Sequence, residues 1–188
     1  PKYATWNYGP QKRLMAAYTL ELSKKNKFFD QGRMILAYQS IEESRITRKF
    51  NNVWENHNIE NLDIFTLNAD FAKKINKHEF RYGAEAYLNK VNSTAFANNL
   101  AVDTSMAIST RYPDGGSSMK SVAVYATHTW EVCDKFIIND GLRFSYVGLN
   151  ANFIDKTYFP FPFNSINQNN SAFNGNLGFV YLPAKTWR

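Results

Sequence analysis

Apolar and polar residues alternate with a period of two along several stretches of this chain. In residues 136–147 one parity is mostly apolar and the other mostly polar. The apolar parity consists of Phe136, Ile138, Leu142, Phe144 and Tyr146. The polar parity consists of Asn139, Gly141, Arg143 and Ser145. Because successive side chains of a strand point to opposite faces, this stretch predicts a β-strand with one apolar and one polar face.

The preceding residues predict a second strand that pairs with the first. In residues 118–132, one parity includes Val122, Val124, Ala126 and Trp130, and the other includes Ser121, Tyr125, Thr127 and Glu131. Only residues 133–135 separate the two stretches, and a turn cluster at 113–116 containing one proline and two glycines comes before them. A connection this short joins antiparallel neighbours, so residues 118–147 predict a long β-hairpin.

Strands of the same kind are predicted at about 12–22, 61–72, 78–89 and 171–182. A strand at about 32–41 alternates poorly, so the facing of its side chains stays open. Residues 1–10 are interpreted as the end of a loop, and Trp187 and Arg188 as the start of an eighth strand. The chain is therefore predicted to be all-β, an antiparallel up-and-down meander of about seven to eight strands.

The lengths of the predicted connections alternate. Those at 23–30, 73–77, 133–135 and 183–186 are short, and those at 42–57, 90–117 and 150–170 are long. In a meander every second connection lies at the same edge of the sheet. Outer-membrane barrels have this asymmetry, with short turns at one edge and long loops at the other. A soluble sandwich also alternates apolar and polar faces but has no reason to sort its loop lengths.

Composition and charge exclude several classes of protein. Aromatic residues make up 16% of the chain, which suits strands and membrane interfaces. No stretch approaches the roughly 18 apolar residues of a membrane helix, and no signal peptide is visible. The net charge is +6, with basic clusters at 24–27, 45–49 and 73–77. These clusters lie at predicted strand ends or in loops and form no continuous stripe, which argues against nucleic acid as a partner.

The sequence offers no catalytic or metal-binding pattern. His57, His78 and His128 fall on three different predicted elements, without the convergent spacing of a metal site. The single Cys133 lies at a turn edge and cannot form an internal disulfide. We find no nucleophile paired with a base. We therefore expect neither enzymatic activity nor a cofactor.

Several longer stretches resemble one family of proteins. These are RYPDGGSSM, DGLRFSYV, FPFN and NLGFVYLPAKTWR, with WNYGPQKRLM, SIEESR and RKFNN nearer the start. Together they resemble the β-barrel of TonB-dependent outer-membrane receptors, over nearly all of residues 1–188. The resemblance implies one domain that is part of a transmembrane barrel. In the family that barrel has about twenty-two strands and an N-terminal plug, and neither the plug nor the energy-coupling box is recognisable in this chain.

The resemblance also implies a function: import of a scarce, bulky nutrient such as an iron chelate, haem or cobalamin, in the bacterial outer membrane. The expected partners are outer-membrane lipid, the rest of the barrel and the plug, the energy-coupling TonB protein through that plug, and a small bulky ligand. The long loops would form the ligand side. The loop residues expected to contact ligand are Arg45, Arg48, Trp54, Arg111, Tyr112, Tyr158 and Phe159. A soluble antiparallel β module that binds carbohydrate or protein is the alternative.

Overall fold

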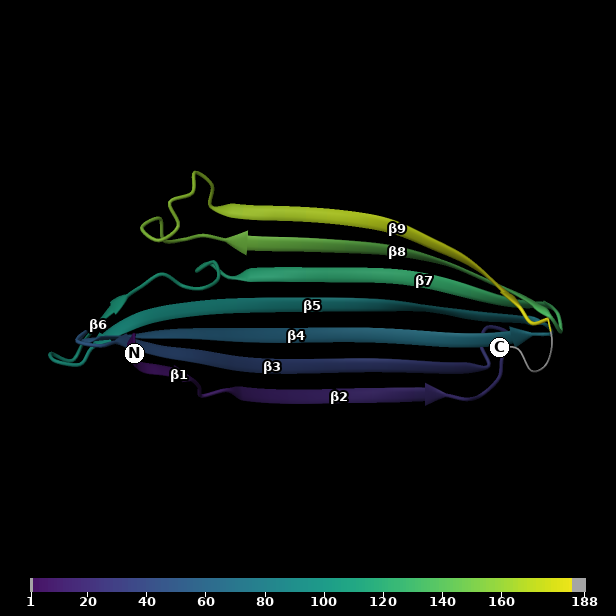
Figure 1. The fold of residues 1–188 in the computed structure, drawn as a ribbon, viewed down its shortest axis with the longest axis horizontal. Helices are drawn as coiled ribbons and strands as arrows, with labels where there is room; N and C mark the ends of the chain where they lie inside the picture. Colours follow the sequence, from purple (N-terminus) through teal and green to yellow (C-terminus); the bar gives the residue numbers. More distant parts are fainter. Residues whose placement is uncertain (1, 184–188) are drawn as a thin grey trace.

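The computed structural model describes residues 2–183, which form one antiparallel sheet (Figure 1). The strands of this part of the chain are β1 (Tyr3–Tyr8), β2 (Lys12–Leu22), β3 (Gln31–Lys49), β4 (Trp54–Ile75), β5 (His78–Asn99), β6 (Thr104–Ala107), β7 (Ser117–Cys133), β8 (Phe136–Asn152) and β9 (Ser165–Tyr181). Within residues 2–183 no helix occurs, and hence none that could span a membrane. The predicted all-β meander is confirmed.

The strands pair in the order β1-β3-β4-β5-β7-β8-β9, with β2 also on β3 and β6 on β5. Every pairing is antiparallel, as predicted. In Figure 1 the strands lie side by side in a curved sheet, with β2 and β9 as its outermost strands. The sheet does not close on itself within the described residues.

The first ten residues are not simply a loop, as the sequence had suggested. Residues 3–8 form β1, which pairs with residues 45–49 of β3, while β2 pairs with residues 32–42 of the same strand. The two strands thus lie end to end along β3. The break between them falls at Gly9, whose φ is +135°, and at Pro10, which has no N–H to donate. The Gly9 amide still donates to the carbonyl of Ser44, at 2.9 Å.

The strands extend further than predicted at one edge of the sheet. Residues 42–57 were expected to be a connection, but β3 and β4 run through most of them and leave only a turn at 50–53. β5, β8 and β9 likewise extend into the predicted long connections at 90–117 and 150–170. The predicted strict alternation of short and long connections is therefore wrong for the first pair. The connection at 50–53, which was predicted to be long, is shorter than the one at 23–30, which was predicted to be short.

The two edges nevertheless differ. One edge, the loop edge, carries residues 50–53, 100–116 and 153–164, and the other, the turn edge, carries 23–30, 76–77 and 134–135. Figure 1 shows the larger loops gathered at the loop edge. The predicted turn at 183–186 and the start of an eighth strand at 187–188 lie outside the described residues, apart from position 183.

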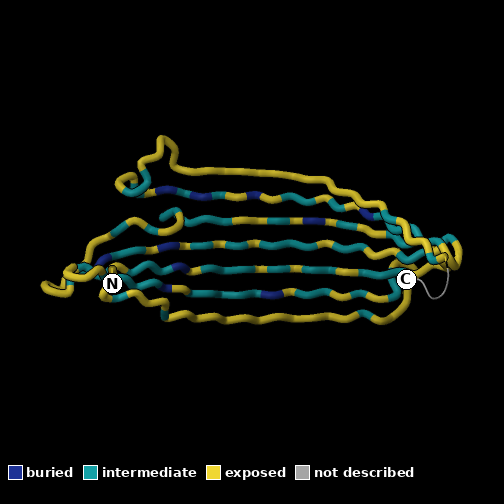
Figure 2. Tube along the Cα trace, viewed as in Figure 1, coloured by how far each residue is buried: buried dark blue, intermediate teal, exposed yellow. Residues whose placement is uncertain are grey.

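One face of the sheet, the outer face, carries a continuous apolar band. The strand register places one row of its side chains across the whole sheet: Leu20, Met34, Ala69, Ala84, Val124, Phe144 and Phe173. Many large side chains of this band are exposed, up to 68% for Phe173. Figure 2 shows correspondingly few buried stretches along the chain. An uncovered apolar surface of this extent indicates contact with lipid or another apolar phase.

The apolar band ends before the strands do. Towards the loop edge, a parallel row on the same face consists mostly of polar residues: Leu14, Ser40, Asp63, Lys90, Ser118, Asn150 and Asn167. β4 and β5 each have 22 residues, whereas about 9–11 suffice to cross the hydrocarbon core of a membrane. The strands therefore continue as a polar extension beyond the apolar band.

The facing of β3, left open by the sequence, is resolved by its pairing with β4. Met34 and Leu36 lie on the outer face with Ala69 and Leu67. Ile35 and Ala37 point to the opposite, inner face, and Ala37 is buried. Both faces of β3 are therefore apolar in this region, which explains why the strand does not alternate clearly.

Candidate functional site

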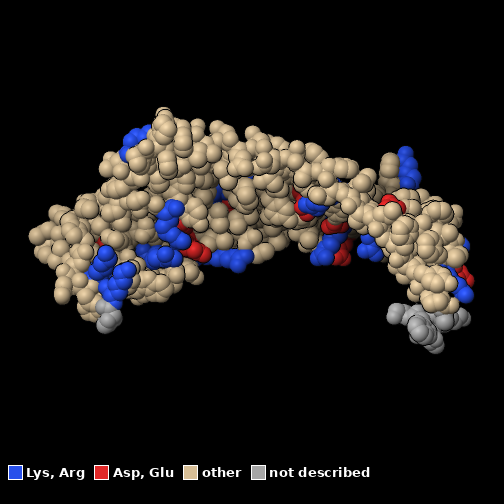
Figure 3. Space-filling view, turned by 45° about the horizontal axis from the view of Figure 1, so that its top comes forward, with Lys and Arg blue, Asp and Glu red and all other residues tan. Residues whose placement is uncertain are grey.

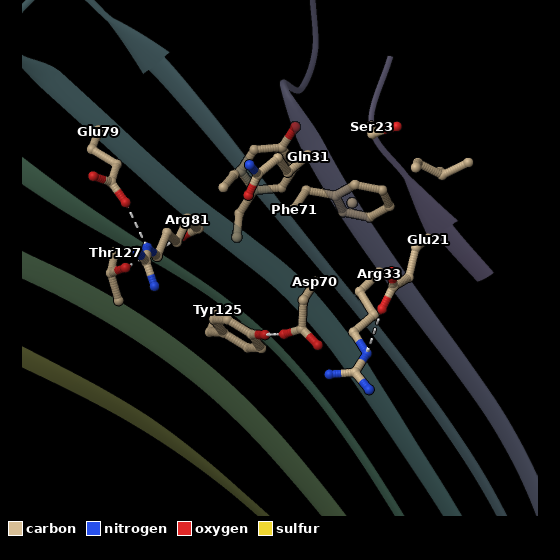
Figure 4. Close-up of a pocket in the computed structure, with 14 residues that line it drawn as sticks. Glu21, Ser23, Gln31, Arg33, Asp70, Phe71, Glu79, Arg81, Tyr125 and Thr127 are labelled. Atoms are coloured by element: carbon tan, nitrogen blue, oxygen red, sulfur yellow. Dashed lines mark hydrogen bonds and ion pairs between the residues drawn. The ribbon is translucent and has the colours of Figure 1, made fainter. Parts of the chain in front are cut away.

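The inner face near the turn edge is a polar wall. A hollow of about 820 Å³ lies there, and its lining includes Glu21, Arg33, Asp70, Arg81, Tyr125 and Thr127. Figure 4 shows these side chains projecting from neighbouring strands towards one space. The Tyr125 hydroxyl donates to the Asp70 carboxylate, and Arg81 Nε lies 2.7 Å from Glu79 Oε1. The charges of this wall are thus mostly satisfied by one another.

Close backbone approach supports this polar wall at Gly83. A Cβ atom at this position would lie 2.4 Å from the Ala69 carbonyl oxygen and 2.5 Å from the Tyr125 hydroxyl. Only glycine leaves room for Tyr125 to lie across β5 and reach Asp70 on β4. The hydrogen bond from Tyr125 to Asp70 joins β7 and β4, which are separated by β5. It therefore depends on the absence of a side chain at position 83.

Leu142 and Arg143 are assigned to opposite faces, as their order on β8 requires. Leu142 is 56% exposed within the outer apolar band. The Arg143 guanidinium donates to Glu85 and to Ser145 on the inner face, and lies over the Tyr125 ring. Figure 3 shows a hollowed surface on which blue and red atoms occur in adjacent groups between large uncharged areas. The inner face thus has the paired charges of a wall that contacts water.

Nearer the loop edge the inner face becomes apolar. A second hollow, of about 760 Å³, is lined mainly by side chains from six strands. Its apolar lining includes Ile41, Leu62, Val91, Met119, Leu149 and Ile166. Tyr112 and Pro113 from the loop 108–116, and Phe153 from the loop 153–164, complete the wall. The inner face therefore has two zones, one ionic and one apolar.

A half-buried ion pair, with Glu60 buried and Arg111 exposed, lies at the loop-edge side of the apolar hollow. Glu60 is only 6% exposed, and its carboxylate lies 3.3 Å from Arg111 Nη1. Ser93 Oγ donates to the same carboxylate at 3.4 Å. Because a buried carboxylate without a partner is costly, Arg111 ties the loop 108–116 to β4.

Asp114 connects the same loop to the loop 153–164. Its carboxylate accepts hydrogen bonds from the backbone N–H groups of Ile154 and Asp155, at 2.9 and 2.7 Å. Partial burial alone would raise the pKa of this carboxyl. These two N–H groups, together with those of Asp114 itself and Gly115, outweigh that effect and hold the pKa below its ordinary value. The two loops therefore form one connected unit at neutral pH.

The loop 153–164 is organised by aromatic packing. Phe153, 8% exposed, contacts the rings of Phe159, Phe161 and Phe163 at centroid distances of 5.1–6.0 Å. Lys156 Nζ donates to the carbonyls of Phe161 and Phe163. The prolines of the Phe-Pro-Phe-Pro-Phe segment keep it out of the strands, as the sequence predicted.

Two histidines that the sequence analysis had treated separately come together on the outer face near the turn edge. His78 Nδ1 lies 2.9 Å from His128 Nε2, and His128 Nδ1 lies 3.0 Å from Asp140 Oδ2. Phe80 and Trp130 stack against the pair. Spacing along the chain could not reveal this contact, because it depends on the register of β5 and β7. Within residues 2–183 no group of three or more side chains is placed to hold a metal ion.

The whole chain, residues 1–188, matches the family described as TonB dependent receptor-like, beta-barrel. The chain belongs to this family. Members of the family are transporters of the bacterial outer membrane rather than enzymes. A search of curated proteins finds no match.

Solved structures of TonB-dependent receptors show the same fold. The copper transporter OprC superposes with a TM-score of 0.74 at 8% identity, covering 96% of this chain and 29% of that protein. The ferric citrate transporter FecA gives 0.66 at 12%, with 97% and 27% covered. The siderophore receptor PiuA from Acinetobacter baumannii gives 0.64 at 13%, with 93% and 30% covered. The chain thus spans less than a third of the length of each of these receptors.

The residues expected to contact ligand in this TonB-dependent receptor chain fall into two groups. Arg111, Tyr112, Tyr158 and Phe159 lie in loops at the loop edge, and the Tyr158 hydroxyl donates to the Ala107 carbonyl at 2.5 Å. Arg45, Arg48 and Trp54 were predicted in a loop but lie within β3 and β4.

The three strand residues have different surroundings. Arg45 lies over the Tyr8 ring, at 4.9 Å. Arg48 donates to the Asn52 carbonyl at 3.3 Å and has the parity of the outer face. Trp54 begins β4, and its backbone amide donates to Asn52 Oδ1. Glu60 could not be singled out from the sequence, because a lone glutamate in a polar stretch carries no sign that it is buried in the fold.

Proposed function

We propose that the protein containing this chain imports a scarce, bulky nutrient across the bacterial outer membrane, with an iron chelate, haem or cobalamin as cargo. The family match over residues 1–188 carries the proposal. The names of FecA and PiuA, which refer to ferric citrate and to a siderophore, favour an iron chelate among these cargoes. Their low identity to this chain supports the fold and leaves the cargo to experiment.

In this proposal the two faces of the sheet have different surroundings. The outer band contacts outer-membrane lipid, and the inner face lines a lumen completed by the rest of the barrel and the plug. The TonB protein acts through that plug. A soluble antiparallel binding module is disfavoured, because its water-exposed surface would then include the large side chains of the outer band.

The loop edge is the proposed ligand side. The residues proposed to contact cargo are Arg45, Arg48, Trp54, Arg111, Tyr112, Tyr158 and Phe159. Arg111 and Tyr112 are the first to test, because both line the apolar hollow on the inner face. Arg48 has the parity of the outer face and would reach cargo only beyond the apolar band.

Uptake measurements test this function directly. The gene for the full-length protein is deleted, and uptake of labelled ferric chelates, haem and cobalamin is measured with and without complementation. We expect one cargo to lose uptake on deletion and to regain it with the wild-type gene. The double variant Arg111→Ala/Tyr112→Ala should restore less uptake than Asp134→Ala, which lies at the turn edge. Unchanged uptake of every cargo after deletion would refute the proposal.

A further inference from the structure

We propose that the apolar hollow of the inner face is a binding subsite for an uncharged, largely apolar organic group that carries one hydrogen-bonding function. This inference deepens the proposed function, since it names the part of a cargo that this wall receives. The inference rests on the proposed function in one respect only: both assume that the inner face lines the lumen of the barrel.

The hollow has the size and lining of a small-molecule site. Its volume of about 760 Å³ falls within the range of roughly 300–1,000 Å³ that is typical of ligand pockets. Ile41, Leu62 and Val91 lie in one register row across β3, β4 and β5. Ala151 and Ile166 continue this row on β8 and β9. A contiguous apolar area on a face that is ionic elsewhere requires an apolar contact to exclude water.

Two unpaired polar groups lie within this apolar lining. Asn89 Oδ1 and Ser117 Oγ are buried, and neither has a hydrogen-bond partner among the described residues. Both residues line the hollow. Rotation of the serine hydroxyl, or of the asparagine amide about its broad terminal torsion, would present a donor or an acceptor to an occupant. Because unsatisfied buried polar groups are unfavourable, an occupant with one matching polar group gains a hydrogen bond here.

The charges around the hollow favour an uncharged occupant. Glu60 and Arg111 neutralise each other at the loop-edge side, and the carboxylate is further held by Ser93. Asn89 and Ser117 are neutral. The third charged residue of the lining, Glu43, is exposed, so its carboxylate is screened by water and offers little to offset the desolvation of a cation in the hollow. An anion would lose hydration without finding a free positive charge in the lining.

The loop that covers the hollow is held in place independently of any occupant. Tyr112 and Pro113 contribute to the lining, and the neighbouring Asp114 accepts two backbone N–H groups from residues 154 and 155. The Gly115 amide also donates to the Asn152 carbonyl, at 3.0 Å, and the Asn152 amide donates to the Gly116 carbonyl at the same distance. The wall is therefore preformed, which reduces the entropy lost when a ligand binds.

A neutral fluorescent probe tests this subsite. N-phenyl-1-naphthylamine is aromatic, uncharged and mostly apolar, carries one N–H group, and fluoresces strongly in apolar surroundings. The full-length protein in lipid nanodiscs is titrated with the probe, and protein-free nanodiscs give the contribution of lipid. We expect a saturable component with the protein in addition to the linear lipid signal.

Substitutions on the two faces of the sheet assign this component. The double variant Asn89→Ala/Ser117→Ala should weaken the saturable binding about three- to tenfold, as expected for one lost hydrogen bond. Leu149→Trp, which fills the hollow, should abolish it. The control Asn92→Ala replaces the same residue type on the outer face of the same strand, β5, outside the lining of the hollow, and should bind as the wild type does. The far-ultraviolet circular dichroism spectrum verifies that each variant keeps its sheet.

Two results would overturn the subsite. If the wild type shows only the linear lipid signal, the hollow is filled by another segment of the protein or by lipid. If a saturable component survives Leu149→Trp unchanged, the probe binds elsewhere. Uptake is measured separately, so saturable binding with the expected variant pattern, in a protein that imports none of the tested cargoes, would refute the proposed function and retain the subsite.

Discussion

Leu142 and Arg143 on β8 offer a direct test of which face contacts lipid. Leu142→Arg would place a charge in the outer apolar band, at a cost of about 2–4 kcal/mol near the bilayer midplane and less towards either interface. Arg143→Leu would leave the outer band unchanged and remove the partly exposed pair with Glu85, a loss of about 1 kcal/mol. The measurement is the free energy of unfolding of the full-length protein and both variants in lipid vesicles.

The sign of the difference between these two variants decides the orientation. We expect Leu142→Arg to be clearly the more destabilising. A larger effect from Arg143→Leu would mean that the inner face contacts lipid, and equal effects would favour a soluble sheet.

Gly83 provides a second test at the scale of a single residue. Gly83→Ala should destabilise the protein by about 1–3 kcal/mol, because the new methyl group meets the backbone oxygen of Ala69 as well as Tyr125. Gly178→Ala on β9 is the matched control, since its Cβ would lie no closer than 3.8 Å to the nearest atom, the Asn139 carbonyl oxygen. Thermal unfolding of both variants measures the effect. A Gly83→Ala protein as stable as the control would show that Tyr125 does not need this close approach.

The connection between two loops through Asp114 predicts a dependence on pH. The pKa of this carboxyl is lowered in the folded loops, so its contribution to their stability is fully present above the ordinary value of 3.8 and is lost as pH falls through the lower folded value. We expect hydrogen exchange in residues 153–164 to be slow at neutral pH and to accelerate, relative to the intrinsic rate, once the carboxyl is protonated.

Asp114→Ala should remove this dependence. In that variant residues 153–164 should exchange rapidly at neutral pH as well, whereas Asp134→Ala, at the turn edge, should behave as the wild type does. Exchange that stays equally slow in Asp114→Ala would mean that the aromatic packing around Phe153 alone holds the loop.

The strands were predictable where one of their faces meets an apolar environment. β2 and β7 alternate clearly, and their predicted bounds agree closely with the structure. β8 also alternates clearly and begins where it was predicted, but it extends further at the loop edge. The end of β3 and the start of β4 could not be predicted, because beyond the apolar band both faces are polar and the period-two pattern disappears. For the same reason Arg45, Arg48 and Trp54 were predicted to lie in a loop, although they lie in strands.

Contacts that depend on strand register could not be predicted from the sequence, for a different reason. The approach of His78 to His128, and of Tyr125 to Asp70, joins residues 50 and 55 positions apart. No local pattern fixes such pairs until the strands are aligned. The candidate site was therefore predictable only as the loop edge, while Glu60 and the apolar hollow required the aligned sheet.

At the scale of the whole molecule, the described sheet has two free edges, on β2 and on β9. Unpaired strand edges present rows of N–H and C=O groups that pair readily with other strands. The outer apolar band adds a second associating surface. In the longer receptor, neighbouring barrel strands and lipid would cover both features.

The chain of residues 1–188, produced alone in detergent-free buffer, is therefore expected to form oligomers or aggregates. Light scattering coupled to size-exclusion chromatography measures its mass, with the full-length protein in detergent as the control. The full-length protein should contain one copy per micelle, since its barrel leaves no strand edge free. A detergent-free sample of the chain that remains a monomer with an open sheet would contradict the expectation, because such a sheet would have to keep both edges and its apolar band in water.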